Sequence, residues 1–480
     1  MARHANILPN ETRRRRLRPF GATAMCLGLS LALAAPIAAR GDEAPSAQNL
    51  GHDTEGDPSP SGSTAHECPN PPNFKYFVDE SKLPFDALPG LDSFRKYGVL
   101  NGAGWRAEFP KDGWNGEIVY WAHGFAGWEC ELNVDAPPIR SYLIAHGYAW
   151  AASSYATNGY AVQQGVDDTM RLSRYLAKRV GTPKRQWLAG ASMGGHITGV
   201  AIEQNPTAFV GAMPVCGVMG SGKLFDYFLD FNELAQSISG VQTSYPYGVD
   251  YVPAVVPQIK AALGGPASPK FLALAAAVQQ RTGGTRPGFG IGFGVWLDFL
   301  FGLGQPNPGV VPAFPATNLR TRYQLDDDPA LSSAEVGLNA GVRRVSRFNF
   351  ATPDGTIAIP RVNGTMEIPT LTLHTLGDLF VPFSMEQVYA RRTAAEDNSE
   401  LLVQRAIRDV GHCSFSQKEL NEGFADLVAW VKTGTRPLGD DVLTPSVVAN
   451  PSYGCKFTRT TPGVPGPGET AARAAFAPCP

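Results

Sequence analysis

The sequence predicts an α/β protein with a doubly wound, mostly parallel sheet and a large inserted cap. Short apolar runs alternate with amphipathic helical patterns along much of the chain. That alternation is typical of a parallel sheet with helices on both faces. One long segment, residues 217–366, interrupts it. The 480 residues are 43% hydrophobic and 18% charged, which allows a large buried core and excludes a wholly disordered chain.

The N-terminal residues are expected to form an export signal rather than part of the fold. Six arginines precede residue 19, and residues 21–39 are uncharged and rich in Ala and Leu. A basic stretch before a short apolar one is typical of a secretory signal peptide, so we assign 1–39 to it. Adjacent arginines resemble the bacterial twin-arginine signal, with an ordinary Sec signal as the alternative. Residues 40–66 are expected to be a flexible leader, and the mature protein to be secreted or periplasmic.

Charge and motif content exclude several classes of partner. Without residues 1–39 the chain carries 35 basic and 42 acidic residues, so no global basic field is available to hold nucleic acid. The apolar stretch near the N-terminus is broken by Pro36 and is too short for a membrane span. Neither H-E-x-x-H nor a paired C-x-x-C occurs, so we expect no metal and no cofactor. A small-molecule or polymeric substrate is the expected partner, and the oligomeric state stays open.

The core elements follow from short apolar runs and from helical periodicity. Val162, Val166 and Met170 recur at four-residue steps and predict a helix, and Leu420, Phe424 and Leu427 predict another. We assign residues 67–216 and 367–480 to the sheet domain. Its predicted strands are Glu117–Ala122, Tyr148–Ser153, Gln186–Ala189, Phe209–Val215, Thr370–Thr375 and Leu401–Ile407.

Residues 217–366 are too long for a simple connection and predict an inserted cap. The segment holds an aromatic run from Phe289 to Phe301 among nine glycines between Gly283 and Gly309. Asp354-Gly355 and Asn363-Gly364 suggest hairpin turns. A lining so poor in charge favours uncharged acyl or aryl groups, and its glycines would let a lid flex. A second, independent domain is the alternative.

The candidate nucleophile is Ser192. It lies in Gly190-Ala191-Ser192-Met193-Gly194, between a predicted strand and a predicted helix. A G-x-S-x-G turn in that context raises the serine hydroxyl above the sheet. The pattern alone is weak evidence in a glycine-rich chain, so its neighbours decide its meaning.

Two further strands end in an acid and a base. Asp378 follows Thr370–Thr375, and His412 follows Leu401–Ile407. The carboxyl ends of parallel strands share one edge of a sheet, so Ser192, Asp378 and His412 are expected to meet there. A hydroxyl becomes a nucleophile when a base takes its proton, imidazole is suited to that task near neutral pH, and a carboxylate orients the imidazole.

With these residues in this order, the chain resembles the α/β-hydrolase superfamily of serine hydrolases over about residues 100–216 and 366–435. The resemblance implies an oxyanion hole formed by the backbone N–H groups of Met193 and Phe125. It points loosely to secreted bacterial esterases and to depolymerase-like or phthalyl-amidase-like members. Tannase-like and feruloyl-esterase-like enzymes are similar at His412-Cys413 but differ at Ala191, where they carry cysteine.

The function expected is hydrolysis of carboxylic esters through a Ser-His-Asp triad and an acyl-enzyme, with apolar or aromatic substrates favoured. The alternatives are an amidase of the same mechanism, a polyester depolymerase and a non-catalytic binding module. Other polar residues are assigned structural roles: His123 shapes the oxyanion loop, His196 caps or packs, and His374 is buried within a strand. Asp409 lies too close to His412 in sequence to orient it, and Asp167-Asp168 reads as a pair of helix first-turn carboxylates.

Six cysteines remain after the predicted signal, an even number that favours disulfides outside the cytoplasm. We expect Cys413 to pair with Cys130 or Cys216 and so to tether the base loop. The alternative for Cys216 is a buried free thiol. A terminal clasp is expected among Cys68, Cys455 and Cys479.

Overall fold

A computed structural model describes residues 75–127, 129–304, 316–346, 359–459 and 468–479. The predicted signal peptide and leader, and Asp354-Gly355, lie outside these residues. Eight strands form one sheet in the order β1-β2-β4-β3-β5-β6-β7-β8. β1 and β2 are antiparallel, β2 pairs antiparallel with β4, and the remaining pairs are parallel. The strands are β1 (Ser93–Leu100), β2 (Ala103–Pro110), β3 (Glu117–Ala122), β4 (Ala149–Ser153), β5 (Arg185–Ala191), β6 (Gly211–Val215), β7 (Thr370–Thr375) and β8 (Leu402–Ile407).

Helices follow most of the parallel strands. Within the described ranges, none is both long and apolar enough to cross a membrane. The α-helices are α1 (Arg140–Ala145), α2 (Val162–Val180), α3 (Met193–Gln204), α4 (Lys223–Ser239), α5 (Val256–Leu263), α6 (Pro269–Arg281), α7 (Phe289–Gly302), α9 (Ser333–Gly341), α10 (Ser384–Ala395), α11 (Gln417–Thr433) and α12 (Pro445–Val448). The other helical elements are the 3₁₀ helices η1 (Glu80–Lys82), η3 (Ser399–Leu401) and η4 (Ala471–Ala475) and the π-helix η2 (Tyr251–Val255).

Successive side chains of the central strands point to opposite faces of the sheet and pack into two separate hydrophobic cores. In β3, Ile118 and Tyr120 pack with α2 and α3, whereas Val119 and Trp121 pack with α1 and α11. Both faces are therefore covered, which explains why these strands read as continuous apolar runs. The predicted doubly wound, mostly parallel sheet is confirmed. Its strand–turn–helix at Ser192 is the arrangement of the α/β-hydrolase fold.

Helix α11 shows how sequence sets an element and its limits. Ser416 and Glu419 form a capping box that satisfies amides at the start of the helix. The helix ends at Gly434, whose φ of 75° is left-handed. Leu420, Phe424 and Leu427 are buried against the sheet, as their spacing predicts.

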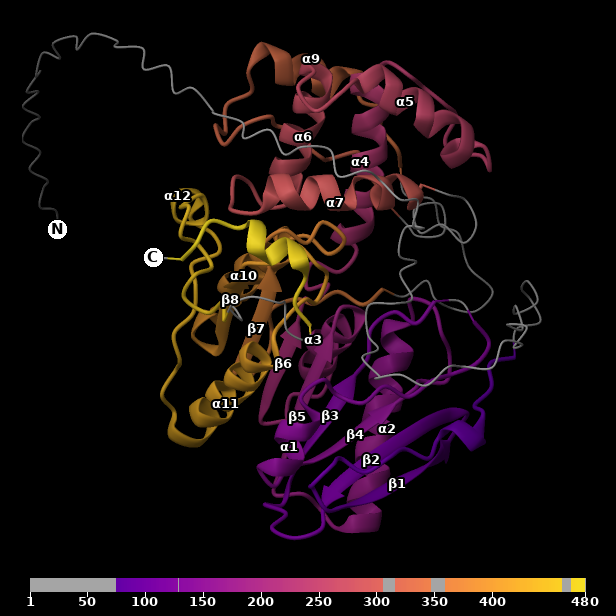
Figure 1. Cartoon of the computed structure of the whole chain (residues 1–480), viewed down its shortest axis with the longest axis vertical. Coiled ribbons are helices and arrows are strands. Elements are labelled where there is room, and N and C mark those ends of the chain that lie inside the picture. The colour runs from indigo at the N-terminus through magenta and orange to yellow at the C-terminus, as the bar shows by residue number, and fades with distance from the viewer. Residues whose placement is uncertain (1–74, 128, 305–315, 347–358, 460–467, 480) are drawn as a thin grey trace, which may run out of the picture. The chain divides into compact units, whose positions relative to one another are not determined.

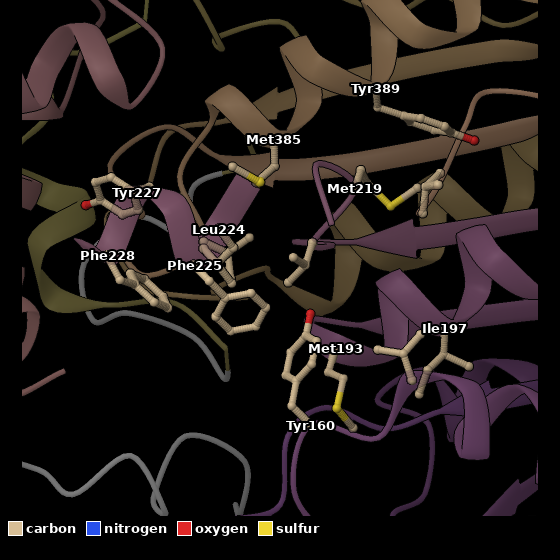
Figure 2. Packing of buried hydrophobic residues seen from close by; sticks show 14 of the residues in the cluster. Tyr160, Met193, Ile197, Met219, Leu224, Phe225, Tyr227, Phe228, Met385 and Tyr389 are labelled. Atoms are coloured by element: carbon tan, nitrogen blue, oxygen red, sulfur yellow. The ribbon is translucent and has the colours of Figure 1, made fainter. Parts of the chain in front are cut away.

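The segment between β6 and β7 supplies α4, α5, α6, α7 and α9 (Figure 1). Its described residues contain no strand, so the hairpin expected at Asn363-Gly364 is wrong: Gly364 does adopt a left-handed φ of 90°, but the residues around it do not pair. The glycine-rich aromatic run forms one continuous helix, α7. Aromatic side chains of the segment join the core on one face of the sheet: Phe225 of α4 contacts Tyr160 edge-on at 5.0 Å, and Met193 belongs to the same cluster (Figure 2).

Helix α7 lies against the carboxyl ends of β7 and β8. A Cβ at Gly292 would overlap the carbonyl oxygen of Gly377, so the helix backbone approaches the loop after β7 as only glycine allows. Trp296 donates its indole N–H to the carbonyl of Val410, at 2.7 Å, in the loop after β8. One helix of the inserted segment thus contacts both of the loops in which sequence predicts the acid and the base.

Candidate active site

Ser192 stands at the turn between β5 and α3 with φ 59° and ψ −120°. A residue with a side chain rarely adopts this conformation, and its surroundings must hold it there. The neighbouring glycines allow the required close packing: a Cβ at Gly190 would overlap the carbonyl of Gly194, and one at Gly194 would overlap the carbonyl of Ala122. Ser192 itself is half-buried, so its hydroxyl is raised at the end of the sheet without being sealed inside.

The structure brings the three residues of the predicted triad together. Ser192 Oγ lies 2.8 Å from His412 Nε2, and His412 Nδ1 lies 2.6 Å from Asp378 Oδ2. A carboxylate can only accept, so Nδ1 carries the ring proton and the Nε2 lone pair faces the serine hydroxyl. The second oxygen of Asp378 accepts the amides of Phe380 and Val381 at 2.8 and 3.0 Å. This buried carboxylate is therefore fixed on both oxygens.

The loop predicted to donate to an oxyanion lies beside the serine. A Cβ on Gly124 would lie 3.4 Å from the Cβ of Ser192. His123 stacks on Tyr155 with ring centroids 4.1 Å apart and shares a 2.7 Å hydrogen bond with the carbonyl of Gly124. Phe125 follows in the same loop. Met193 is the first residue of α3, so its amide is one of the first-turn donors that have no partner within the helix.

A disulfide ties the base loop to the sheet. Cys413 bonds Cys216, which directly follows β6, and Cys413 Sγ lies 3.5 Å from His412 Nε2. Of the two partners expected for Cys413, the structure therefore has Cys216, and the free-thiol alternative is wrong. Cys455 bonds Cys479, as expected for two members of a terminal clasp. Cys68 lies outside the described residues.

Replacing both Cys216 and Cys413 with serine is expected to lower the free energy of unfolding by about 2–5 kcal/mol. The two cysteines are 197 positions apart, so the bond closes a long loop and strongly limits the conformational entropy of the unfolded chain. Its loss restores that entropy and also releases the loop that carries His412. Urea unfolding under non-reducing conditions measures the change. Peptide mapping that finds Cys413 as a free thiol in the native protein would contradict this pairing.

The rival histidines and acids are engaged elsewhere. His374 Nε2 contacts the carbonyl of Val381 at 2.7 Å and Nδ1 contacts Glu386 at 3.2 Å. Burial alone would lower the pKa of His374, but the hydrogen bond and charge of Glu386 outweigh it and raise that pKa. Asp409 is paired with Arg473, and Asp168 with Arg171. The first turn of α2 carries no acidic residue, so the expectation that Asp167 and Asp168 are first-turn carboxylates is wrong. Within the described ranges, no three His, Cys, Asp or Glu side chains are grouped to hold a metal ion.

His196 is held neutral inside the core. Its Nδ1 faces the hydroxyl of Tyr160 at 2.9 Å and its Nε2 faces the carbonyl of Pro360 at 2.7 Å. Burial lowers the pKa of His196 from 6.5 to about 4. Below pH 6.5 this histidine is protonated in the unfolded chain but stays neutral in the folded protein. The free energy of unfolding therefore falls with falling pH until the pH reaches the pKa of His196 in the folded protein.

Between pH 7 and pH 5, this histidine is expected to remove about 2 kcal/mol of stability. Chemical denaturation of wild type and His196→Gln at both pH values tests it. The variant loses two hydrogen bonds and is less stable at pH 7, but its stability should fall less on acidification. An equal fall in both proteins would contradict the neutral assignment.

An aromatic cluster borders the candidate base. Phe380, two residues after Asp378, lies edge-on to the His412 ring at 5.0 Å. Phe228, Trp296 and Phe299 from α4 and α7 surround Phe380 at 4.8–6.2 Å. Sequence reasoning placed the α7 aromatics in the cap but missed their contact with the residue beside the acid. The alternation of Phe and Gly in this run carries no signal of that partner.

Comparisons with known proteins give the following findings. No protein-family model matches the chain. A stretch of 76 residues, 16% of the chain, is 30% identical to the o-phthalyl amidase of Xanthobacter agilis and spans 17% of that protein's length. Similar solved structures include an esterase from Aspergillus oryzae, with 13% identity and a TM-score of 0.41 over 72% of this chain and 81% of that one. Feruloyl esterase B from the same organism has 11% identity and a TM-score of 0.42 over 72% and 82%. An acylaminoacyl peptidase from Pyrococcus horikoshii has 11% identity and a TM-score of 0.33 over 70% and 41%.

Proposed function

We propose that this protein is an exported serine hydrolase that cleaves carboxylic esters with Ser192 as nucleophile, His412 as base and Asp378 as the orienting acid. The observation that carries the proposal is the continuous hydrogen-bond chain from Ser192 Oγ through the His412 ring to Asp378. The N-terminal sequence supports export, as do two disulfides among the described residues, because disulfides persist in oxidising compartments.

In the first half of the reaction, Ser192 Oγ attacks the ester carbonyl carbon while His412 Nε2 takes the hydroxyl proton. The carbonyl oxygen becomes an oxyanion, for which the amides of Met193 and Phe125 are the proposed donors. When the tetrahedral intermediate collapses, its bond to the leaving group breaks. The proton on His412 then goes to the departing oxygen, which leaves as an alcohol and gives the acyl-enzyme.

In the second half, water takes the place of the serine. His412 removes a proton from the water as its oxygen attacks the acyl carbon, and the bond to Ser192 Oγ breaks as His412 returns that proton to the serine. The product is a carboxylic acid. Asp378 remains ionised and stabilises the imidazolium formed in each half-reaction.

The substrate class proposed is uncharged acyl or aryl esters. Phe380 contacts the His412 ring, Phe299 contacts Phe380, and both phenylalanine rings are partly exposed. Trp296 and Phe228 pack against Phe380 from within the protein. Apolar surface gains about 25 cal/mol for each Å² removed from water, so these rings favour apolar groups over charged ones. No step of the reaction requires a metal, and we expect activity to be insensitive to EDTA.

An amidase of the same mechanism is the second candidate, and the local similarity to an o-phthalyl amidase favours it. Ester and amide hydrolysis proceed through the same serine attack and the same acyl-enzyme. They differ in the leaving group: the amine released from an amide must be protonated on nitrogen before it departs. Matched p-nitrophenyl esters and p-nitroanilides of short aliphatic and aromatic acids, with a soluble polyester, separate the candidates. A higher kcat/KM for the anilide than for the matched ester would favour the amidase.

The nucleophile itself is tested with a fluorophosphonate probe, which labels activated serines. We expect labelling of the wild type and none of Ser192→Ala. An unlabelled, folded wild type would contradict the enzyme proposal and favour a binding module instead.

A further inference from the structure

Arg473 lies far from Ser192 in the sequence, in the C-terminal turn η4, yet its guanidinium holds the loop that carries His412. Nε donates to Asp409 Oδ2 at 2.8 Å, and Nη2 donates to the carbonyl of Ser414 at 3.0 Å. These two acceptors flank His412, one before it and one after it. Nη1 donates to Glu419 Oε1 at 2.9 Å, at the start of α11. The arginine side chain is only 5% exposed.

Asp409 connects the Arg473 guanidinium to the backbone of the loop. Its Oδ1 accepts the amides of Val410 and Gly411 at 2.7 and 3.1 Å, and Gly411 directly precedes His412. Thr470, also from the C-terminal segment, donates its hydroxyl to the same oxygen at 2.5 Å. The carboxylate is fully buried, and a buried charge of this kind is stable only when paired and hydrogen-bonded.

The carbonyls of the same loop are held from other sides. Val410 accepts from Trp296, and Gly411 accepts from the hydroxyl of Thr375 at 2.8 Å. The disulfide of Cys413 fixes the next position. Arg473 differs from these contacts because it joins the two ends of the loop to one planar group. Guanidinium is suited to this, since its donors project in a rigid fork that can satisfy several acceptors together.

We propose that Arg473 is the positioning residue of the candidate base: through Asp409 and Ser414 it keeps the His412 ring in line with Ser192 and Asp378. The inference rests on the proposed function. Arg473 does not reach the reacting atoms, so it acts on turnover and not on substrate binding. A displacement of a catalytic group by about 1 Å can reduce the rate about 100-fold, so a small shift of this loop has a large effect.

The test compares Arg473→Met with Arg473→Lys in the full-length protein, using a p-nitrophenyl ester. We expect the methionine variant to lower kcat about 10–100-fold and to leave KM within about twofold. Lysine keeps the charge next to Asp409 but cannot bridge to Ser414 and Glu419, so we expect it to restore part of kcat. Arg459→Met is the matched control: Arg459 is also a C-terminal arginine, but its side chain pairs with Glu422 and does not contact the loop, and its kcat should equal that of the wild type.

A methionine variant with wild-type kcat, or with a raised KM and an unchanged kcat, would overturn the proposal. If that variant does not fold, Thr470→Val decides by the same comparison, because it removes one hydrogen bond to Asp409 and keeps the ion pair. Failure of the proposed function is recognised separately, by wild-type activity that persists in Ser192→Ala.

Discussion

Replacing Ser192 with alanine is expected to lower kcat/KM for a p-nitrophenyl ester by about 10⁴–10⁶-fold and to leave the fold intact. The loss is large because Ser192 supplies the hydroxyl that lies 2.8 Å from His412 Nε2, and without this hydroxyl the proposed acyl-enzyme cannot form. The residual rate would come from substrate binding and from the oxyanion donors, which remain. Alanine removes only the hydroxyl, and at the φ of 59° that Ser192 adopts, alanine is strained about as much as serine, so the fold should be unchanged.

In the proposed mechanism the three triad residues act as one unit, so the losses caused by replacing each of them should not add. We expect His412→Ala to match Ser192→Ala, and the double variant to be no worse than either single one. Asp378→Asn should lose about 10⁴-fold, since the amide favours the wrong tautomer of the ring. Ser446→Ala, an exposed serine of α12, is the control and should keep wild-type kinetics. Activity that survives His412→Ala but not His374→Ala would contradict the choice of base.

The sheet and the candidate triad could be predicted because both depend on local patterns. Buried parallel strands are continuous apolar runs, and each candidate residue lies within five residues of the end of such a run. The hairpin β1–β2 escaped prediction for a physical reason. β1 is an edge strand whose Phe94 and Tyr97 are exposed. β2 buries Glu108, which is neutralised by Arg140 from a helix that lies 32 residues further along the chain.

The supports of the site could be predicted only in part, because they are pairings between distant residues. Six cysteines allow fifteen connectivities, and the sequence left both Cys130 and Cys216 open as partners of Cys413. Cys413 and Cys216 both adopt left-handed φ values, 59° and 43°, which local preference disfavours. Arg473 reaches Asp409 across 64 positions, with no periodicity that connects the two. Trp296 and Val410 are 114 positions apart. Tertiary packing alone decides such contacts.

Gly194→Ala is expected to abolish activity and to prevent stable folding, although it adds one methyl group to a helix. In α3 the new Cβ would overlap the carbonyl oxygen of Ala122 and crowd that of His123. Both obstacles are backbone atoms at the end of β3, so no side-chain rotation relieves the clash. The helix must move away from the strand, which displaces Ser192 and Met193 on one side and the Phe125 loop on the other. Overpacking in a core typically lowers the free energy of unfolding by about 1–3 kcal/mol. We expect Gly194→Ala to cost at least the upper end of this range, because backbone atoms cannot rotate away from the new methyl group.

A graded series of glycine substitutions within helices separates this steric effect from the effect of alanine itself. Gly199, one turn further along α3, would place its Cβ 2.8 Å from the terminal methyl of Met219, a flexible side chain, so Gly199→Ala should fold with a moderate loss of stability. Gly294 in α7 has open space at its Cβ position, and Gly294→Ala should be neutral or gain up to about 1 kcal/mol from helix propensity. Thermal unfolding and fluorophosphonate labelling of the three variants measure their stability and activity, which should both decrease from Gly294→Ala through Gly199→Ala to Gly194→Ala. If Gly194→Ala has the melting temperature and the labelling of Gly294→Ala, the tight contact between α3 and β3 does not set the position of the candidate nucleophile, and the strained turn at Ser192 must be held by other contacts.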